Sequence, residues 1–251
     1  MLAMLFMFMI VFSVASAITI RFHWKQENSI VTVFLGIGLL LYIFGLLNSM
    51  PVAIYIIIAL AILSFIYAVI SLFKKKIAIK EIFTLGTLFY MALLILSGIL
   101  LKNTYYTQWD EFSHWGPNLK AMVTYDTFWS NHVYDGIHVV YQPLAGIIEY
   151  LFCYLNGGFA EDVSYMAMST FVITLLLPLY RRLTYTNKDF IKGIFISFIV
   201  YCLVYIFGFS FNSIYIDLLL AVLFAISMLY SYWQEEKEDL FITFLLLISM
   251  V

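Results

Sequence analysis

Charged residues are scarce in this sequence: Asp, Glu, Lys and Arg together make up 11% of its 251 residues, whereas hydrophobic residues make up 64%. The mean hydropathy of +0.99 is far outside the balance of a soluble globular domain. This shortage of charge excludes a water-soluble fold and a nucleic-acid partner, and it indicates that the bilayer is the solvent of the fold.

Other features are also missing. The two cysteines, Cys153 and Cys202, lie in apolar surroundings without metal-ligand spacing. The first apolar run has no basic residue before Arg21, whereas a signal peptide begins with a positively charged region, so we expect a retained helix in place of a signal peptide. The sequence contains no internal repeat and no low-complexity linker.

Long apolar runs dominate what is present. A helix needs about 20 residues to cross roughly 30 Å of hydrocarbon, and open strands would leave backbone groups unsatisfied in lipid. We therefore predict an all-α, polytopic transmembrane helical bundle. Its last run, 240–251, is too short to span, so we expect the chain to stop within a helix. The longer runs are 1–20, 30–47, 51–73, 82–101, 164–180, 193–211 and 214–233.

Basic residues mark the side of the membrane that each loop occupies, because cytoplasmic loops are enriched in Lys and Arg. The stretch 143–155 is apolar, short and interrupted by Glu149, which favours an interfacial or re-entrant helix. If it does not cross, eleven of the thirteen Lys and Arg lie inside and only Lys102 and Lys120 outside; if it crosses, the division is six to seven. We therefore predict that it stays on the outer side.

This topology divides the chain into three parts. Residues 1–101 form four N-terminal transmembrane helices, 102–163 form an external loop with interfacial helices and an acidic pair, and 164–251 form the C-terminal helices, the last one incomplete. The same topology places Asp217, at the outer end of the 214–233 helix, on the face that carries the loop.

The loop holds most of the polar chemistry. Residues 102–142 contain three of the four histidines, three of the five tryptophans and the adjacent acids Asp110 and Glu111. Paired carboxylates allow one group to accept a proton from an attacking hydroxyl while the other binds a cation or positions the first. The alternative is a helix cap or an exposed acidic surface. In a helix, Asp110 and His114 would share one face.

A second feature of the loop is its apolar and aromatic pattern. Gly116 and Pro117 end one turn and can start another helix, in which an apolar stripe suits a position flat on the bilayer. The stripe is Leu119, Met122 and Val123. The aromatic residues fit an interfacial belt; they are Trp109, Trp115, Tyr125, Phe128 and Trp129.

The histidines admit two interpretations. They are exposed loop residues, or His114, His132 and His138 converge on a metal, which spacing alone does not show.

At these residues the chain resembles the GT-C superfamily of membrane glycosyltransferases, which includes protein O-mannosyltransferases and the aminoarabinose transferase of lipid A. A helix leads to Asp110-Glu111, an amphipathic segment around Lys120 follows, then 125–129 (YDTFW), and 142–144 (QPL) opens an apolar helix. Asp217 is similar to the family's second acidic position. The family places this loop after its first helix, whereas here three helices precede that one.

The resemblance implies an enzyme of the cell envelope, in the bacterial plasma membrane with its active loop outside. It would move a sugar, hexosyl or pentosyl, from a polyprenyl-phosphate carrier to a hydroxyl of a glycan, lipid or protein. Asp110 would be the catalytic base and Glu111 its companion, and the carboxylates of Asp110 and Asp217 would permit a divalent cation, Mg²⁺ or Mn²⁺. The candidate substrate-binding residues are His114, Trp115, Lys120 and Lys102.

Two other classes of function stay open. An ionisable residue such as Asp217 near a membrane segment suits a lipid-linked sugar transporter or flippase component. Exposed aromatics suit a non-catalytic membrane assembly subunit that binds a partner or a carbohydrate.

Overall fold

All regular secondary structure in the described residues is helical, as predicted. The computed structural model describes residues 1–132, 143–202 and 214–250. The longer helices are α1 Leu2–Phe22, α2 Gln26–Leu46, α3 Met50–Phe73, α5 Leu85–Leu101, α8 Glu161–Leu176 with its 3₁₀ extension η3 Leu177–Tyr180, α9 Asn187–Cys202, α10 Ile216–Trp233 and α11 Asp239–Ile248. The shorter ones are α4 Ile79–Ile82, the π-helical turn η1 Glu111–Trp115, α6 Gly116–Tyr125, the 3₁₀ turn η2 Trp129–Asn131 and α7 Leu144–Asn156.

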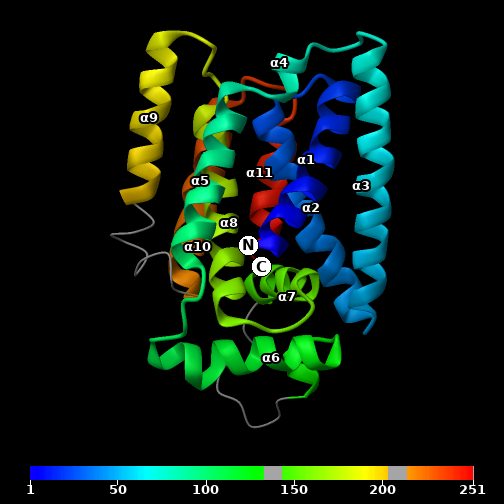
Figure 1. Ribbon diagram of the computed structural model, residues 1–251, viewed down its shortest axis with the longest axis vertical. Helices are drawn as coiled ribbons and strands as arrows, with labels where there is room; N and C mark the ends of the chain where they lie inside the picture. The colour runs from blue at the N-terminus through cyan, green and yellow to red at the C-terminus, as the bar shows by residue number, and fades with distance from the viewer. Residues whose placement is uncertain (133–142, 203–213, 251) are drawn as a thin grey trace.

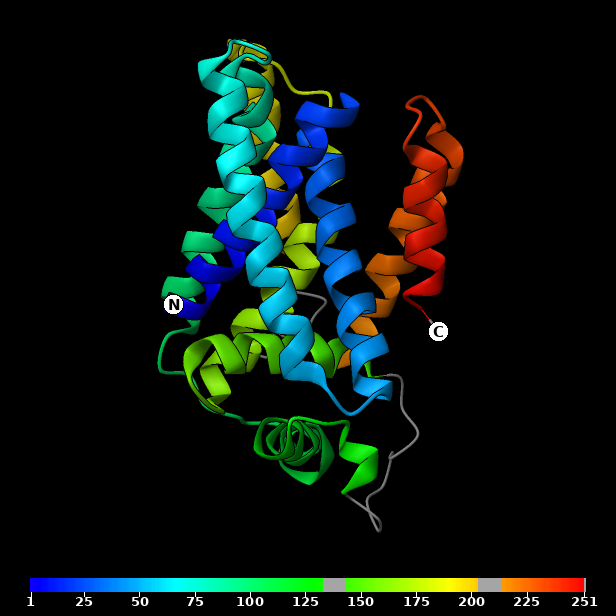
Figure 2. The same cartoon turned by 90° about the vertical axis from the view of Figure 1, so that its right-hand side faces the viewer.

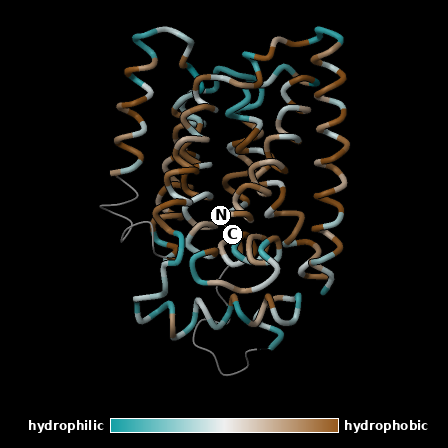
Figure 3. Tube along the Cα trace, in the orientation of Figure 1, coloured by the Kyte–Doolittle hydropathy of each residue, from teal (hydrophilic) through white to brown (hydrophobic). Residues whose placement is uncertain are grey.

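The longer helices run side by side along the long axis of the molecule (Figure 1). Among the described residues, five stretches are long and apolar enough to cross a membrane: α1, α2, α3, α8 with η3, and α10. Hydrophobic residues fill the middle of the bundle, and hydrophilic residues gather at its turns (Figure 3). This is the architecture of a multi-pass membrane protein, and it confirms the predicted fold class.

Two short helices depart from this direction. Helices α6 and α7 lie across one end of the bundle, and α7 lies between α6 and the long helices (Figures 1 and 2). Helix α7 has only 13 residues, about 20 Å at 1.5 Å per residue, which is too short for the hydrocarbon core. Its side chains from Ile147 to Cys153 are all buried, because it packs against α1, α2 and α8 as well as α6.

The transverse position of α7 fixes the path of the chain. Helix α5 runs into this end of the bundle and α8 leaves from the same end, so α7 adds no crossing (Figure 1). The connections that hold most of the Lys and Arg residues lie at the opposite end, which we call the basic end. They are residues 23–25, 74–84, 181–186 and 234–238.

Hydrogen bonds between side chains join the helices in the middle of the bundle. The Tyr90 hydroxyl on α5 lies 2.8 Å from Oγ1 of Thr174 on α8, and Ser97 bonds to Ser169 between the same two helices. Such bonds satisfy polar groups that water does not reach inside the bundle. Each contributes about 1 kcal/mol to the stability of a membrane bundle.

A buried ion pair organises the basic end. The Arg181 guanidinium donates two hydrogen bonds to Asp239, of 2.7 and 3.2 Å, and it lies 3.9 Å above the Trp233 ring. Asp239 also accepts the backbone N–H groups of Glu235 and Glu236, each at 3.1 Å. These contacts hold η3 to the end of α10 and the start of α11.

Arg181→Ala should therefore destabilise the protein strongly. The change leaves the Asp239 carboxylate buried without its counter-ion, which costs about 3–5 kcal/mol, so the melting temperature in detergent should fall by many degrees. The matched control is Arg182→Ala, since this neighbour pairs with Glu235 at the surface and is worth at most about 1 kcal/mol. Equal shifts for the two variants would contradict the role of the buried pair.

The topology predicts a labelling pattern. In a protein that lacks Cys153 and Cys202, single cysteines at the exposed positions Ser113, Asn156 and Thr186 are treated with an impermeant maleimide on intact cells. Ser113 and Asn156 should react and Thr186 should not, because the two former lie at the end opposite the basic loops. Labelling of Thr186 with protection of Asn156 would mean that α7 crosses the membrane.

Candidate functional site

The segment after α5 is held against the start of α8. The backbone N–H of Tyr106 donates to the Glu161 carboxylate at 2.7 Å, and its hydroxyl lies 2.8 Å from the Ser164 hydroxyl at the start of α8. Tyr106 is buried, so these bonds fix the loop against α8 before η1 begins.

Glu111, the first residue of η1, points into the protein. Its Oε2 accepts hydrogen bonds from the backbone N–H groups of Thr107 (2.8 Å) and Gln108 (2.9 Å) and from the Tyr165 hydroxyl (2.9 Å). The residue is fully buried, and its Oε1 has no hydrogen-bond partner among the described residues. Glu111 therefore anchors the loop to α8 while it keeps one free acceptor atom.

Gly116 makes the packing of η1 feasible. A Cβ at this position would lie 2.5 Å from both the Glu111 carbonyl oxygen and the Tyr106 ring. Gly116 donates its N–H to that carbonyl, the i→i+5 bond of a π-helical turn, and it starts α6 with Pro117 in the first turn. The prediction that this pair begins a helix is confirmed, and π-helical turns are frequent at functional sites.

A second carboxyl group faces Glu111 from α7. Glu149 is buried, and its Oε1 also has no partner among the described residues. Burial, and then the charge of Glu111, raise the pKa of Glu149 well above its usual range. We call these two residues the buried acid pair.

A small cavity adjoins Glu149, one member of the pair. Its volume is about 10 Å³, close to the space that one water needs, and Glu149 and Asn118 line it. The Asn118 side-chain nitrogen is buried and lacks a partner among the described residues as well. Two residues with unsatisfied polar atoms thus line the same cavity, where a water can bind.

Asp110, the neighbour of Glu111, is less buried. It is half-buried and hydrogen-bonds through its carboxylate and its backbone to Tyr215, the residue that precedes α10. Burial and the Asp110 carboxylate raise the pKa of the Tyr215 hydroxyl. Asp217 lies two residues further on, in the first turn of α10, and is exposed. The residue before α10, Tyr215, thus contacts Asp110, while Asp217 lies exposed at the surface.

The predicted histidine and lysine sites are spread over the loop. His114 is buried in η1, where its Nδ1 lies 2.7 Å from the Ser113 hydroxyl and its ring packs on half-buried Trp115 at 4.8 Å. His132 is exposed and stacks on Tyr125 at 4.1 Å. His138 lies outside the described residues, as does Gln142 of the family-like pattern. Lys102 and Lys120 are both exposed.

The described residues do not form a metal centre. No three His, Cys, Asp or Glu side chains among them gather closely enough to hold an ion. A Mg²⁺ or Mn²⁺ ion held by the two carboxylates of Asp110 and Asp217 stays a prediction.

Two parts of the interfacial pattern are corrected. Phe128 and Trp129 are buried, because Phe128 packs on Tyr42 at 5.7 Å and Trp129 packs over Gly146 of α7. The stripe residues Leu119 and Met122 are buried too, and Met122 approaches the same glycine. The apolar face of α6 therefore packs on α7, while Trp109 stays exposed as a belt residue would.

The sequence reasoning missed the role of Glu149. The signal was present, since an ionisable residue inside an apolar stretch usually has a function. Glu149 lies near Glu111, 38 positions earlier, because α7 packs across the bundle. The spacing of the two residues along the sequence does not indicate this.

Comparison of the chain with protein-family models, with curated proteins and with solved structures finds no match. Any function proposed for this site therefore rests on the geometry of its own residues.

The pKa of Glu149 predicts how stability depends on pH. The folded protein holds this proton more tightly than the unfolded chain, so folding is favoured at low pH. Stability should fall as pH rises above about 4.5, the ordinary Glu value, by at most about 1.4 kcal/mol per unit. Glu149→Gln removes the titrating group and should flatten the melting temperature between pH 5 and 8. An identical pH profile in the variant would contradict burial of this carboxyl group.

Proposed function

We propose that the chain is a membrane glycosyltransferase that moves a sugar from a polyprenyl-phosphate carrier to an acceptor hydroxyl at the end of the bundle opposite the basic loops. The observation that carries the proposal is the divergence of the two adjacent acids. Glu111 is buried and fully engaged at Oε2, whereas Asp110 is half-buried at the surface of the same turn. One acid holds the loop, and the other is accessible for chemistry.

Asp110 would act as a general base in this reaction. The acceptor hydroxyl oxygen forms a bond to the anomeric carbon as Asp110 takes its proton, and the bond from that carbon to the carrier phosphate oxygen breaks. The polyprenyl phosphate leaves with the bonding electrons, so the configuration inverts. Base catalysis of this kind contributes about 10²–10⁴-fold to a rate.

The surroundings of Asp110 support the assignment. Its hydrogen bonds with Tyr215 limit the orientations of the carboxylate, which keeps the base in place for an incoming hydroxyl. The transverse helices α6 and α7 supply a rigid platform at the level where lipid headgroups would lie (Figure 2). Lys102 and Lys120, both exposed near this end, are the candidates to attract the carrier phosphate.

Asp110→Asn should lower sugar transfer at least a hundredfold while the protein stays folded, because the amide cannot accept the proton. Purified protein is incubated with a panel of polyprenyl-phosphate hexoses and pentoses and the acceptor lipids of the membrane. Asp162→Asn is the matched control, since this acid lies at the same end and, among the described residues, accepts a hydrogen bond from the loop backbone at Asn103. Unchanged transfer in folded Asp110→Asn would overturn the mechanism.

A transporter or flippase component is the second candidate, and the buried acid pair favours it. A protonated carboxyl group beside a second acid is a common coupling element in proton-driven transport. Under this hypothesis Glu149→Gln abolishes the pH dependence of flipping of a labelled lipid-linked sugar in vesicles, and Asp110→Asn leaves flipping intact. Under the transferase hypothesis no flipping depends on Glu149.

A further inference from the structure

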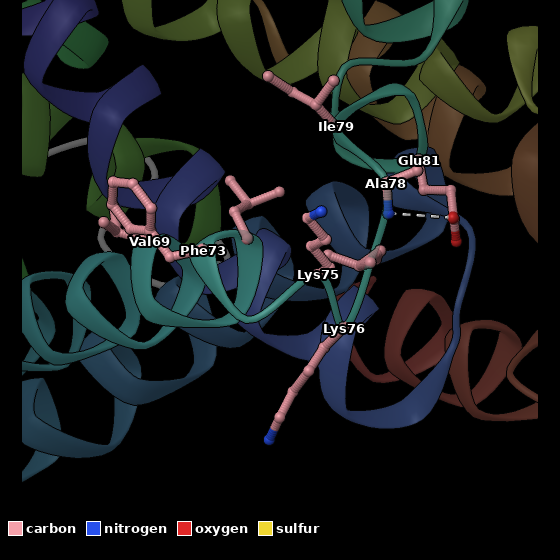
Figure 4. A pocket seen from close by; sticks show the side chains of 9 residues that line it. Val69, Phe73, Lys75, Lys76, Ala78, Ile79 and Glu81 are labelled. Atoms are coloured by element: carbon pink, nitrogen blue, oxygen red, sulfur yellow. Dashed lines mark hydrogen bonds between the residues drawn. The ribbon is translucent and has the colours of Figure 1, made fainter.

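A pocket of about 710 Å³ lies at the basic end, where α3 passes into the loop before α4. Figure 4 shows its walls, with the apolar side chains of Phe73 and Ile79 on either side and the ammonium group of Lys75 between them. The one acid on its wall, Glu81, accepts the backbone N–H of Ala78 at 3.3 Å and so serves to cap α4. The pocket combines an apolar lining with positive charge.

The lysines around this pocket have no carboxylate partners. Of the described residues at the basic end, Lys25, Arg181, Arg182 and Lys192 form ion pairs within 4.0 Å. Lys75 and Lys76, which line the pocket, do not do so, and neither do their neighbours along the chain, Lys74 and Lys80. All four are exposed. Their charge is available to an anion from outside the protein.

An apolar groove of about 730 Å³ continues from this pocket along α1 and α3, and Val69 and Leu72 line both. The groove offers almost no hydrogen bonds to an occupant. The hydroxyls of Ser13 and Ser16 on its wall donate to carbonyls of their own helix, to Met9 at 2.6 Å and to Phe12 at 2.7 Å. Only a hydrocarbon is well matched to such a lining.

The groove also has the length of a lipid chain. It follows α3 from Ile58 to Leu72, which is about 21 Å at 1.5 Å per residue, or most of a hydrocarbon core of about 30 Å. It ends near Tyr154 of α7, far from the lysines. A molecule that fits both parts has an anionic head and a long apolar chain.

We propose that this surface binds one anionic phospholipid, with its phosphate at Lys75 and Lys76 and one acyl chain in the groove between α1 and α3. Basic pockets beside transmembrane helices at the cytoplasmic side are suited to anionic headgroups, which are abundant in that leaflet. The site lies at the opposite end of the bundle from Asp110, so the proposal does not depend on the proposed function.

The test measures lipid binding to the purified full chain by native mass spectrometry, with phosphatidylglycerol and phosphatidylcholine as probes. Phosphatidylglycerol should bind with a stoichiometry of one. The double variant Lys75→Gln/Lys76→Gln should bind it roughly thirtyfold more weakly, since each lysine at an anionic lipid contributes about fivefold. The control Lys188→Gln/Lys237→Gln removes the same charge at the same end, outside the pocket, and should bind as the unaltered protein does.

A third variant tests the groove. Ser13→Phe fills part of it and should weaken binding of phosphatidylglycerol without changing the binding of glycerophosphoglycerol, which has no chains. Equal losses in the two lysine double variants would reduce the effect to general surface charge and overturn the proposal. Phosphatidylcholine binding as tight as phosphatidylglycerol binding, or undiminished binding in Ser13→Phe, would overturn it as well.

Discussion

The transverse packing of α7 is the constraint on which the rest of the structure depends. Its 13 residues are too few to cross the bilayer, yet its side chains from Ile147 to Cys153 are buried, so it lies across the ends of α1, α2 and α8. As a result α5 and α8 meet at one end, Tyr215 reaches Asp110, and the basic loops lie together at the other end. If this apolar run were long enough to cross the membrane, α8 and α10 would run in the opposite direction, and the acids at their ends would lie at the other end of the bundle.

The same packing has an energetic cost that points to function. Glu149 is buried on α7 beside Glu111, and each has an oxygen without a hydrogen-bond partner among the described residues. A buried polar atom left unsatisfied costs about 1–3 kcal/mol. Burial raises the pKa of Glu149, which favours the neutral acid and lowers this cost, and a site of this kind suits proton exchange or the ordering of a loop. The proposed transferase uses the second property, with Glu111 as anchor and Asp110 at the surface.

Much of the fold could be predicted from the sequence, because in lipid the length of an apolar run nearly decides whether it spans. The short stretch 143–155 and the charge balance also predicted a helix that does not cross the membrane, and α7 lies across one end of the bundle. The site was harder to predict. The different burial of the neighbours Asp110 and Glu111, and the proximity of Glu149 to Glu111, both depend on tertiary packing. The burial of Phe128 and Trp129 arises from glycines on the facing helices, Gly45 and Gly146, which periodicity within 102–142 could not show.

Infrared spectroscopy of the carboxyl groups tests whether Glu149 is buried beside Glu111. We expect a protonated carboxylic acid band at neutral pH that disappears in Glu149→Gln and persists in Asp217→Asn, since Asp217 is exposed. A spectrum without that band, or a band unaffected by Glu149→Gln, would show that Glu149 is not buried against Glu111 and that α7 does not lie across the bundle as described.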